Sequence, residues 1–416
     1  MILREKFVVD VSPLRTSREF RYLFVARVVS ILGLGMLAVT VPLQTFTLTD
    51  STMHVALVAA VLGVSTFSGT FAGGVLADRA DRRLVIAVSR GTAGVMFAVL
   101  ALNAFLPAPQ LWIIYVAAAI DGLCGGISAT ALMAVTPSLI PRDKIPAAGA
   151  LMALTADLGS MVGPAVGGVV IAATNVGVTY ASAAALTAVT TFCITRLPSL
   201  PPADATQESA MESLRSGARF AFGNRVIGGV LAAGFVTMLL AGWAVLIPEY
   251  ATEVLNVGPA STGLLYTAPA IGAVLGSLTS GWTAGARRVG VAIFVAMFVS
   301  AAGLAGAGAT SILVLSLVFL AAHGFGDAIT EILRYSTVQR HTPDEFRGRV
   351  AGVWSAQVTA GAALGALVAG AVAALVPVQT ALAAYGVTGL VCVAFLAVTL
   401  KSLRALDETP EPSYVE

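Results

Sequence analysis

Apolar residues form twelve long runs along the chain, separated by short polar segments. Each run is long enough to cross about 30 Å of hydrocarbon as a helix that rises about 1.5 Å per residue. The pattern therefore predicts twelve membrane-spanning helices. Their predicted ranges are 23–46, 54–77, 84–106, 111–135, 146–172, 176–197, 226–248, 261–284, 289–307, 311–333, 350–374 and 378–400.

All 24 Lys and Arg residues fall on one side of the predicted membrane. They lie in the N-terminal arm, in every second loop (the last of them at 334–349) and after the final span. Arg27, Arg90 and Arg196 are inside spans, but in the half nearest the basic loops. The positive-inside rule then predicts that both termini are cytoplasmic. The polar N-terminal arm predicts no cleaved signal peptide.

Composition narrows the class of protein. With 57% hydrophobic and 11% charged residues, the chain has too few polar groups to cover a soluble globule of its size. This composition predicts membrane lipid as a partner. The net charge is only +2 and the basic residues are spread over many short loops, which predicts no nucleic-acid partner. Cys124, Cys193 and Cys392 lie in apolar runs without CxxC or Cys/His spacing. We therefore expect no disulfide, no metal site and no cofactor.

One long repeat divides the chain. The sequence GGVLADRADRR follows the second span, and the degenerate copy SGWTAGARR follows the eighth. Two six-helix halves related by an axis along the membrane normal would produce this pattern. We expect an N-terminal bundle over residues 1–197 and a C-terminal bundle with a cytoplasmic tail over 226–416. Between them, residues 198–225 read as a cytoplasmic linker with one short amphipathic helix.

The loop after the second span resembles the signature loop of the major facilitator superfamily, although Asp81 stands where that family usually has glycine. The resemblance implies an all-α fold of two parallel six-helix bundles. It also implies that Asp78 faces the start of span eleven and latches the cytoplasmic side shut. A carboxylate can do this because it is attracted to the positive N-terminal end of a helix. A solvated run of charges is the structural alternative. The implied latch residues are Gly74, Asp78, Arg79, Arg82, Arg83 and Arg349.

Span five resembles the antiporter motif carried by exporters of this superfamily. Its motif residues are Gly159, Gly163, Pro164, Gly167 and Gly168. Small residues at four-residue spacing let helix backbones approach closely, and Pro164 is expected to bend the span where the halves meet. Generic helix packing is the alternative. In span four, Asp121 stands where drug antiporters commonly show an arginine, so their proton chemistry does not transfer directly.

Several stretches resemble the bacterial enterobactin exporter family. They are FVARVVSILGLGMLAVTVPLQ, GGVLADRADRR, LNAFLPAPQL, LYTAPAIGAVLGSLTSG and RYSTVQRHTPDEFRGRVAGVW. The resemblance implies export of an iron-free catecholate siderophore across the inner membrane. Macrolide and multidrug exporters share much of this pattern, so a macrolide or multidrug efflux antiporter remains the alternative.

Ionised groups inside the spans are the candidates for coupling transport to protons. An Asp or Arg at mid-bilayer costs about 2.5–3.5 kcal/mol, so each needs a cavity or a partner. Asp121 and Asp157 lie near mid-depth, while His323, Asp327 and Glu331 share one face of span ten. We expect Asp121 and Asp327 to exchange the proton, with Asp157 and His323 as further candidates. The alternatives are a hydroxyl partner for His323 and an interfacial pair of Glu331 with Arg334.

Spans one, four, seven and ten line the central cavity in the family that the chain resembles. The resemblance therefore implies that Arg27, Asp121 and the span-ten acids face it, with Arg27 at a depth that would let it pair with Asp121. Arg90 is assigned to the latch. The candidate substrate-binding residues, suited to an aromatic ligand, are Arg27, Gln44, Trp243, Trp354 and Gln357. Ordinary packing is the alternative for each aromatic residue.

The sequence thus predicts a monomeric, proton-coupled exporter of a small aromatic molecule that works by alternating access. It shows no spaced nucleophile and base, so an enzyme is not expected and no catalytic residues are assigned.

Overall fold

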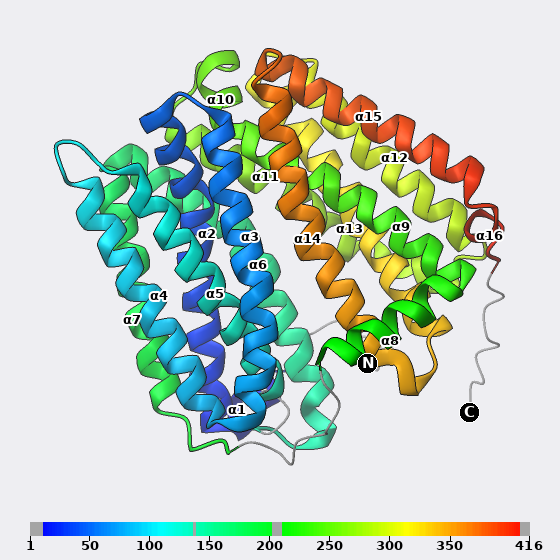
Figure 1. Ribbon diagram of the computed structural model, residues 1–416, viewed down its shortest axis with the longest axis horizontal. Coiled ribbons are helices and arrows are strands. Elements are labelled where there is room, and N and C mark those ends of the chain that lie inside the picture. The colour runs from blue at the N-terminus through cyan, green and yellow to red at the C-terminus, as the bar shows by residue number, and fades with distance from the viewer. Residues whose placement is uncertain (1–10, 136–138, 202–209, 408–416) are drawn as a thin grey trace, which may run out of the picture. The chain divides into compact units, whose positions relative to one another are not determined.

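The computed structural model describes residues 11–135, 139–201 and 210–407 (Figure 1). Within these ranges the chain is helical and contains no β-strand. Twelve of the helices there are long and apolar enough to cross a membrane. The predicted all-α fold with twelve spans is confirmed.

The chain divides into two compact units. The first comprises residues 1–48 and 61–207, and the second comprises 49–60 and 208–416. Within the range predicted as a linker, the structure has the helix α8 (Ala210–Gly223), which belongs to the second unit.

The helices of the first unit begin and end at recognisable signals. They are α1 (Ser12–Thr16), α2 (Arg18–Thr49), α3 (Thr52–Arg79), α4 (Arg82–Ala104), α5 (Leu111–Val135), α6 (Ile145–Ala173) and α7 (Val176–Thr195), with a 3₁₀ turn at Arg142–Lys144. The last residue of α2 and residues 52–60 of α3 belong to the second unit. Asn175 caps α7 by accepting a hydrogen bond from the backbone N–H of Val178 at 3.0 Å. Pro146 stands in the first turn of α6, where its missing N–H costs nothing.

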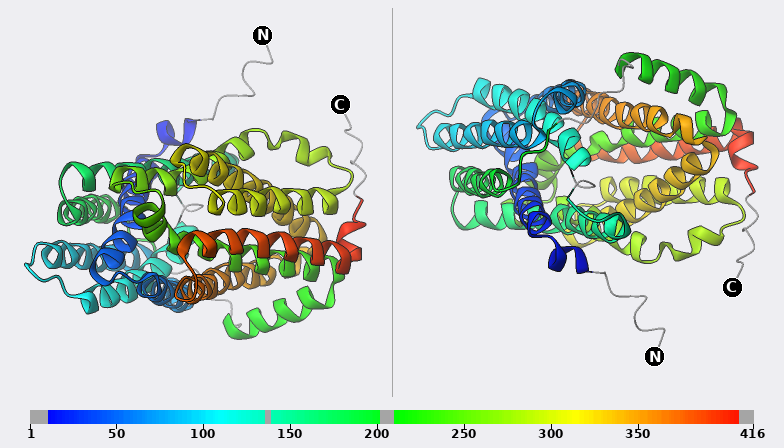
Figure 2. Two further views of the ribbon diagram at one scale, coloured as in Figure 1. Left: turned by 90° about the horizontal axis from the view of Figure 1, so that it is seen from above. Right: turned by 90° about the horizontal axis from the view of Figure 1, so that it is seen from below.

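The second unit holds the remaining helices, which Figure 2 shows from two directions. Those that follow α8 are α9 (Arg225–Leu240), η4 (Ala241–Leu246), α10 (Ile247–Glu249), η5 (Tyr250–Val254), α11 (Pro259–Leu278), η6 (Ser280–Gly285), α12 (Val289–Gly308), α13 (Leu313–His341), η7 (Asp344–Phe346), α14 (Arg347–Ala373), α15 (Val378–Thr399) and α16 (Lys401–Arg404). Here α13 packs against both α11 and α12.

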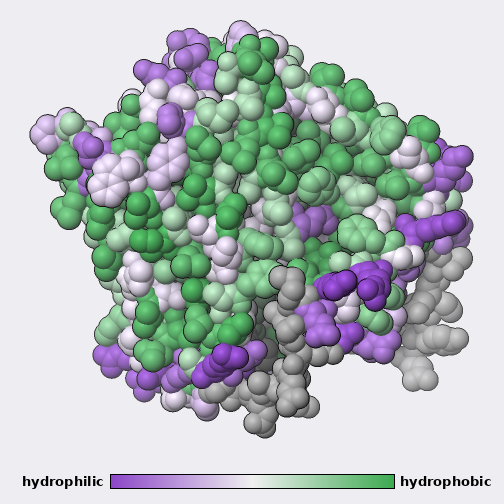
Figure 3. Space-filling view, viewed as in Figure 1, coloured by the Kyte–Doolittle hydropathy of each residue, from purple (hydrophilic) through white to green (hydrophobic). Residues whose placement is uncertain are grey.

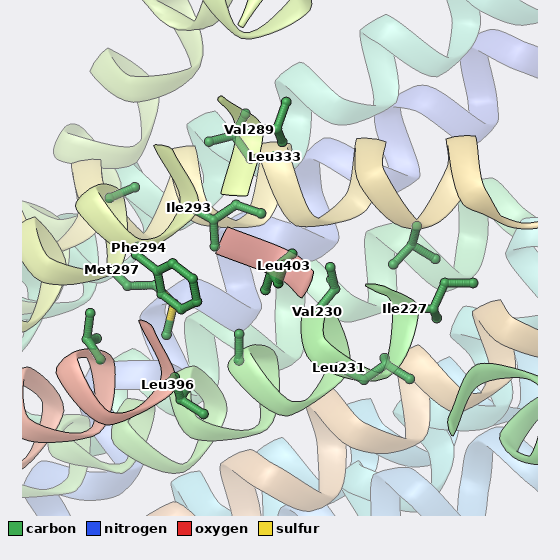
Figure 4. Close-up of a cluster of buried hydrophobic side chains, with 14 of the residues drawn as sticks. Ile227, Val230, Leu231, Val289, Ile293, Phe294, Met297, Leu333, Leu396 and Leu403 are labelled. Atoms are coloured by element: carbon green, nitrogen blue, oxygen red, sulfur yellow. The ribbon is translucent and has the colours of Figure 1, made fainter. Parts of the chain in front are cut away.

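Each unit has an apolar core. In the second unit, side chains from α9, α12, α13, α15 and α16 meet in one buried cluster (Figure 4). In the first unit, Phe20 and Leu23 of α2 pack with Ile86 of α4 and Ile194 of α7. Lipid tails are as apolar as these side chains, so close packing rather than exclusion of water stabilises the bundles.

The outer surfaces of the helices are apolar, as a membrane requires. Figure 3 shows apolar side chains over most of the visible face, with hydrophilic side chains gathered mainly near helix ends. On α15, Val387, Val391 and Phe395 follow at four-residue spacing and are 52%, 62% and 64% exposed. A stripe of this kind is suited to contact with lipid.

Four spans differ from the prediction by at least five residues at one end. Span one begins earlier, at Arg18, and span eight ends earlier, at Leu278, with the 3₁₀ helix η6 after it. Span seven continues beyond 248, and its middle is a 3₁₀ helix (η4) followed by the short α10 and a π-turn (η5). Span ten runs to His341 instead of ending at 333. The prediction of a loop from residue 334 is therefore wrong, because the helix continues through the polar residues that were read as its end.

Candidate functional site

A cavity of about 390 Å³ lies inside the first unit. Three charged side chains line it: Arg27 from α2, Arg90 from α4 and Asp121 from α5. Ser30, Thr66 and Thr190 add hydroxyl groups. Apolar side chains such as Leu34 and Leu62 complete the wall, so the cavity combines a mainly apolar lining with a few convergent polar groups.

Glycine positions on α5 direct Asp121 into this cavity. A Cβ atom on Gly122 would collide with the carbonyl oxygen of Leu62 on α3, and one on Gly126 with that of Thr66. This face of α5 therefore packs directly on the backbone of α3. Asp121 precedes Gly122 and Gly125 precedes Gly126. These two residues are four positions apart, so they share the adjacent face of α5, and both line the cavity.

Asp121 interacts electrostatically with Arg90. The Nε atom of Arg90 donates a hydrogen bond to Ser128 Oγ at 2.9 Å, which fixes the guanidinium beside α5. The expected pair of Arg27 with Asp121 is not formed, because no ion pair within 4 Å joins them in the described part of the chain. The Nε atom of Arg27 is instead buried without a hydrogen-bond partner among the described residues.

Arg90 is a member of this cavity that the sequence interpretation assigned elsewhere. It was assigned to the latch, yet it lines the cavity with Arg27 and Asp121. Arg27 and Arg90 lie at similar depths in their spans, and this similarity in the sequence could have indicated that Arg90 lines the same cavity. The side chain of Asp157, on α6, lies outside the described residues, so its proposed role stays a prediction.

In the second unit, His323 of α13 is turned toward α12. Its Nδ1 atom lies 2.9 Å from Ser300 Oγ and 3.1 Å from the carbonyl oxygen of Ser300. The indole of Trp243, in η4, meets the imidazole edge-on with ring centroids 5.2 Å apart. A cavity of about 20 Å³, enough for one water molecule, lies beside His323 and is also lined by Thr237 and Thr330. The hydroxyl partner expected as the alternative for His323 is therefore present.

Further along α13, Arg334 is held inside the unit. Its side chain is 0% exposed, and its Nη1 atom lies 2.9 Å from the Glu331 carboxylate. Its Nε atom donates to the carbonyl oxygen of Val230 at 3.2 Å, and its guanidinium lies 4.5 Å from the ring centre of Trp354. Glu331 and Arg334 do form the expected pair, with the arginine side chain buried inside the unit. Asp327 interacts electrostatically with both His323 and Arg334.

The remaining candidate binding residues are mostly engaged with other side chains. Gln44 is buried and accepts a hydrogen bond from the Tyr180 hydroxyl at 2.8 Å, away from the cavity of the first unit. Trp354 stacks on Arg334. Gln357 has its Nε2 atom buried without a hydrogen-bond partner among the described residues, near Gly234.

The signature loop is tied to the end of α7. Asp81 caps α4 through the backbone N–H of Arg83 at 2.9 Å. It also accepts hydrogen bonds from Ser199 Oγ at 2.7 Å and from the N–H of Leu200 at 3.1 Å. The backbone N–H of Arg82 donates to the carbonyl oxygen of Leu200, and Arg83 Nη1 donates to that of Leu197. Asp81, the residue that departs from the family's glycine, is thus the centre of this connection.

The other latch and motif residues are placed as follows. Asp78 and Arg79 are exposed at the end of α3, and nothing lies within 4 Å of a Cβ added at Gly74. Arg349, on α14, lies over the Phe346 ring. The antiporter-motif residues lie on α6, where a Cβ on Gly163 would be 2.6 Å from Gly35 Cα and one on Gly167 would be 2.9 Å from Met36 Cα, both on α2. Gly159 meets Ile31 of α2, and Pro164 and Gly168 are buried.

Comparison with known proteins identifies the family. A family model described as transmembrane secretion effector matches residues 9–415. The enterobactin exporters EntS of Shigella boydii serotype 18 and of Escherichia coli O139:H28 are each 36% identical to this chain over 407 residues, which is 98% of this chain and 98% of the relative.

Solved transporter structures share the fold. The nucleoside transporter NupG superposes with a TM-score of 0.76 at 14% identity, covering 92% of this chain and 99% of that one. A POT family transporter in complex with 5-aminolevulinic acid gives 0.74 at 10% identity, covering 93% and 97%. The protein is therefore a multi-pass membrane transporter, not an enzyme, and it belongs to the transmembrane secretion effector family of the major facilitator superfamily, together with the enterobactin exporters.

Proposed function

We propose that this protein exports an iron-free catecholate siderophore across the bacterial inner membrane, in exchange for protons and by alternating access. One observation carries the proposal: the chain is 36% identical, over 98% of both lengths, to proteins named enterobactin exporter. The matched region covers 98% of the chain, so it includes the spans that carry the buried charges.

The cavity of the first unit supports a small aromatic substrate. Its volume of about 390 Å³ is at the lower end of the range of about 300–1,000 Å³ found for small-molecule sites. Apolar side chains provide surface for a ring, while Arg27, Arg90 and Asp121 provide polar contacts. Arg27 is thus the predicted binding residue that the geometry supports best.

We assign proton exchange to Asp121 and Asp327, with Asp157 and His323 as further candidates. Protonation removes the charge of a buried carboxylate and so changes which conformation is favoured. One proton moving through 100 mV supplies about 2.3 kcal/mol, which at about 1.4 kcal/mol per decade sustains a substrate gradient of roughly fifty-fold. A single coupled proton would therefore be adequate.

The protein would work as a monomer surrounded by lipid, with both termini in the cytoplasm. The basic residues in alternate loops support this orientation. Asp78 and Arg349 would close the cytoplasmic side in one state of the cycle.

Deletion of the gene tests the substrate. We expect siderophore to accumulate in the cytoplasm and growth to slow in iron-poor medium, with rescue by the plasmid-borne gene. Secretion that is unchanged in a deletion strain without a redundant exporter would refute the siderophore and favour the macrolide or multidrug alternative.

Proton coupling requires a purified system. In proteoliposomes that contain the full chain, an imposed pH gradient should drive accumulation of enterobactin, and collapsing the gradient with an ionophore should abolish it. Accumulation that persists without the gradient would contradict proton exchange while leaving the substrate assignment intact.

A further inference from the structure

The cavity of the first unit presents an unused hydrogen-bond acceptor. Asp121 lines this cavity, and no residue in the described part of the chain donates a hydrogen bond to its carboxylate or forms an ion pair with it within 4 Å. Its nearby cation, Arg90, uses Nε to bind Ser128. An ionised carboxylate accepts through two oxygen atoms and donates nothing. The Asp121 carboxylate could therefore accept hydrogen bonds from a ligand that donates them.

There is open space directly beside it. Gly125 lies one turn after Asp121 on the same face of α5, and nothing stands within 4 Å of a Cβ added there. Across the cavity, Arg27 has a buried Nε atom without a hydrogen-bond partner among the described residues. A carboxylate with free acceptor capacity and an unpartnered buried donor line the same cavity, and that arrangement indicates a ligand site.

We propose that Asp121 accepts hydrogen bonds from the two adjacent hydroxyl groups of a neutral catechol, and that this contact selects the iron-free siderophore over its metal complex. The inference rests on the proposed function. It assigns to the Asp121 carboxylate oxygens the distinction between the iron-free and the metal-bound substrate. Asp121 is in this view a specificity-determining residue.

The protonation state of the ligand explains the selection. A phenolic hydroxyl has a pKa of about 10, so a free catechol keeps both protons at neutral pH and presents two donors side by side. Two O–H groups can then donate to the two oxygens of one carboxylate, and such charge-assisted bonds are about twice as strong as neutral ones. A catechol that chelates a metal through both oxygens has lost both protons. It would place acceptors against an acceptor and leave the carboxylate unsatisfied.

The two arginines provide a competing hypothesis with the opposite sign. Arg27 and Arg90 outnumber Asp121 among the charges that line the cavity, and they would attract an anionic, metal-loaded ligand. If they dominated recognition, removing the negative charge of Asp121 would strengthen binding of the metal complex without weakening that of the free catechol. If Asp121 reads the hydroxyl groups, the same change weakens binding of the free catechol.

The test compares three probes on the purified full-length chain: iron-free enterobactin, the same molecule with every catechol oxygen methylated, and its gallium(III) complex. The methylated probe is neutral but has no catechol donor, so it separates hydrogen bonding from charge. The wild type should bind the iron-free form at least about tenfold more tightly than either other probe, the difference expected for losing a hydrogen bond to a charged group. In Asp121→Asn this preference should fall to about twofold, because an amide offers one acceptor and adds donors.

Two glycine variants locate the effect. Gly125→Leu should fill the cavity without a backbone clash and weaken binding of the iron-free probe more than tenfold. Gly149→Leu, on α6, is the matched control, because nothing lies within 4 Å of its added Cβ and it does not line the cavity. It should bind like the wild type.

The failures are distinguishable. The inference is overturned if the wild type binds the methylated probe as tightly as the free one, if Asp121→Asn keeps the wild-type preference, or if Gly125→Leu binds normally. A wild-type protein that binds and transports none of the three probes would instead refute the proposed function.

Discussion

Asp81 is held by four interactions that act on its ionised form. Partial burial by itself would raise the pKa of its carboxyl group, but the hydrogen bonds from Ser199, Leu200 and Arg83, together with the charge of Arg83, lower that pKa below its usual value. A carboxyl whose pKa is lowered by folding stabilises the folded state above its unfolded pKa of about 3.9. That contribution is lost as the pH falls through the lower, folded value.

Replacing Asp81 separates its two roles. Ser can still cap α4 but is too short to reach Ser199 and Leu200, so Asp81→Ser should lower the unfolding temperature slightly, whereas Asp81→Ala should also lose the cap, worth about 0.5–2 kcal/mol. The difference between wild type and Asp81→Ser, measured by thermal unfolding in detergent, should be constant from pH 8 to pH 5 and should shrink only below about pH 4. A difference that vanishes already near neutral pH would contradict this assignment.

Asp327 tests coupling in the second unit. If it carries the exchanged proton, Asp327→Asn should abolish export driven by a pH gradient but keep much of the counterflow, in which substrate exchanges without net proton movement. The matched control is Asp344→Asn, since Asp344 is 88% exposed in a surface pair with Arg347. Full pH-driven export by Asp327→Asn would remove Asp327 from the proton pathway.

Sequence alone placed Arg27 and Asp121 among the candidate cavity residues but assigned Arg90, the third charged residue of that cavity, elsewhere. Depth along a span follows from counting residues, and so Arg27, Asp121 and Asp327 could be placed. The direction of a side chain around its helix depends on which face packs, and that is determined by contacts such as Gly122 with Leu62. Arg90 was therefore assigned to the latch, although it lies beside Asp121.

Helix α6 crosses α2 at a pair of glycines. Gly163 and Gly35 face each other so closely that a Cβ on Gly163 would lie 2.6 Å from Gly35 Cα. Gly163→Ala should therefore force the helices apart and destabilise the protein by about 1–3 kcal/mol, the usual cost of overpacking. Thermal unfolding in detergent measures this loss.

The matched substitution on the same helix is Gly149→Ala, where an added Cβ meets nothing within 4 Å. It should keep or raise the unfolding temperature, because Ala is a better helix former than Gly by about 0.5–1 kcal/mol. Equal stability of the two alanine variants would show that α2 and α6 are not in close contact in the membrane.

The extents of the spans were mostly predictable because hydrophobic length is a strong signal. For example, span five was expected at 146–172, and α6 covers Ile145–Ala173. In span ten the helix continues past the apolar run because polar side chains there find partners. In α13 the extension holds Arg334, whose guanidinium is paired with Glu331 and covered by Trp354. The hydropathy of the local sequence does not show that such partners will be available in the fold.

At the scale of the whole molecule, the proposed alternating access requires the two units to move relative to each other, and the latch prediction concerns that step. Asp78 is exposed at the end of α3, so Asp78→Asn should fold and insert normally. Weaker closure of the cytoplasmic side should reduce transport by up to about tenfold, consistent with a charge–dipole contact of about 1 kcal/mol or somewhat more.

Transport per inserted protein in proteoliposomes is the measurement for Asp78→Asn. Asp143→Asn is the control, because Asp143 is an exposed carboxylate between α5 and α6 that takes no part in the proposed latch. If Asp78→Asn transports at the wild-type rate, the latch assignment is wrong and the charged loop serves only to orient the chain.

The buried arginine of α13 also constrains how the protein is made. Arg334 leaves the ribosome before Trp354, which lies twenty positions later in the chain and covers the guanidinium in the finished fold. Inserting an arginine costs up to about 2.5–3.5 kcal/mol on translocon scales, the value for the centre of a span. Glu331 is already present one turn earlier in the nascent helix and lies 2.9 Å from the guanidinium in the finished fold. The two residues can therefore enter the bilayer as a neutral pair. Glu331 would then compensate the charge of Arg334 during insertion, before the rest of the unit has folded around it.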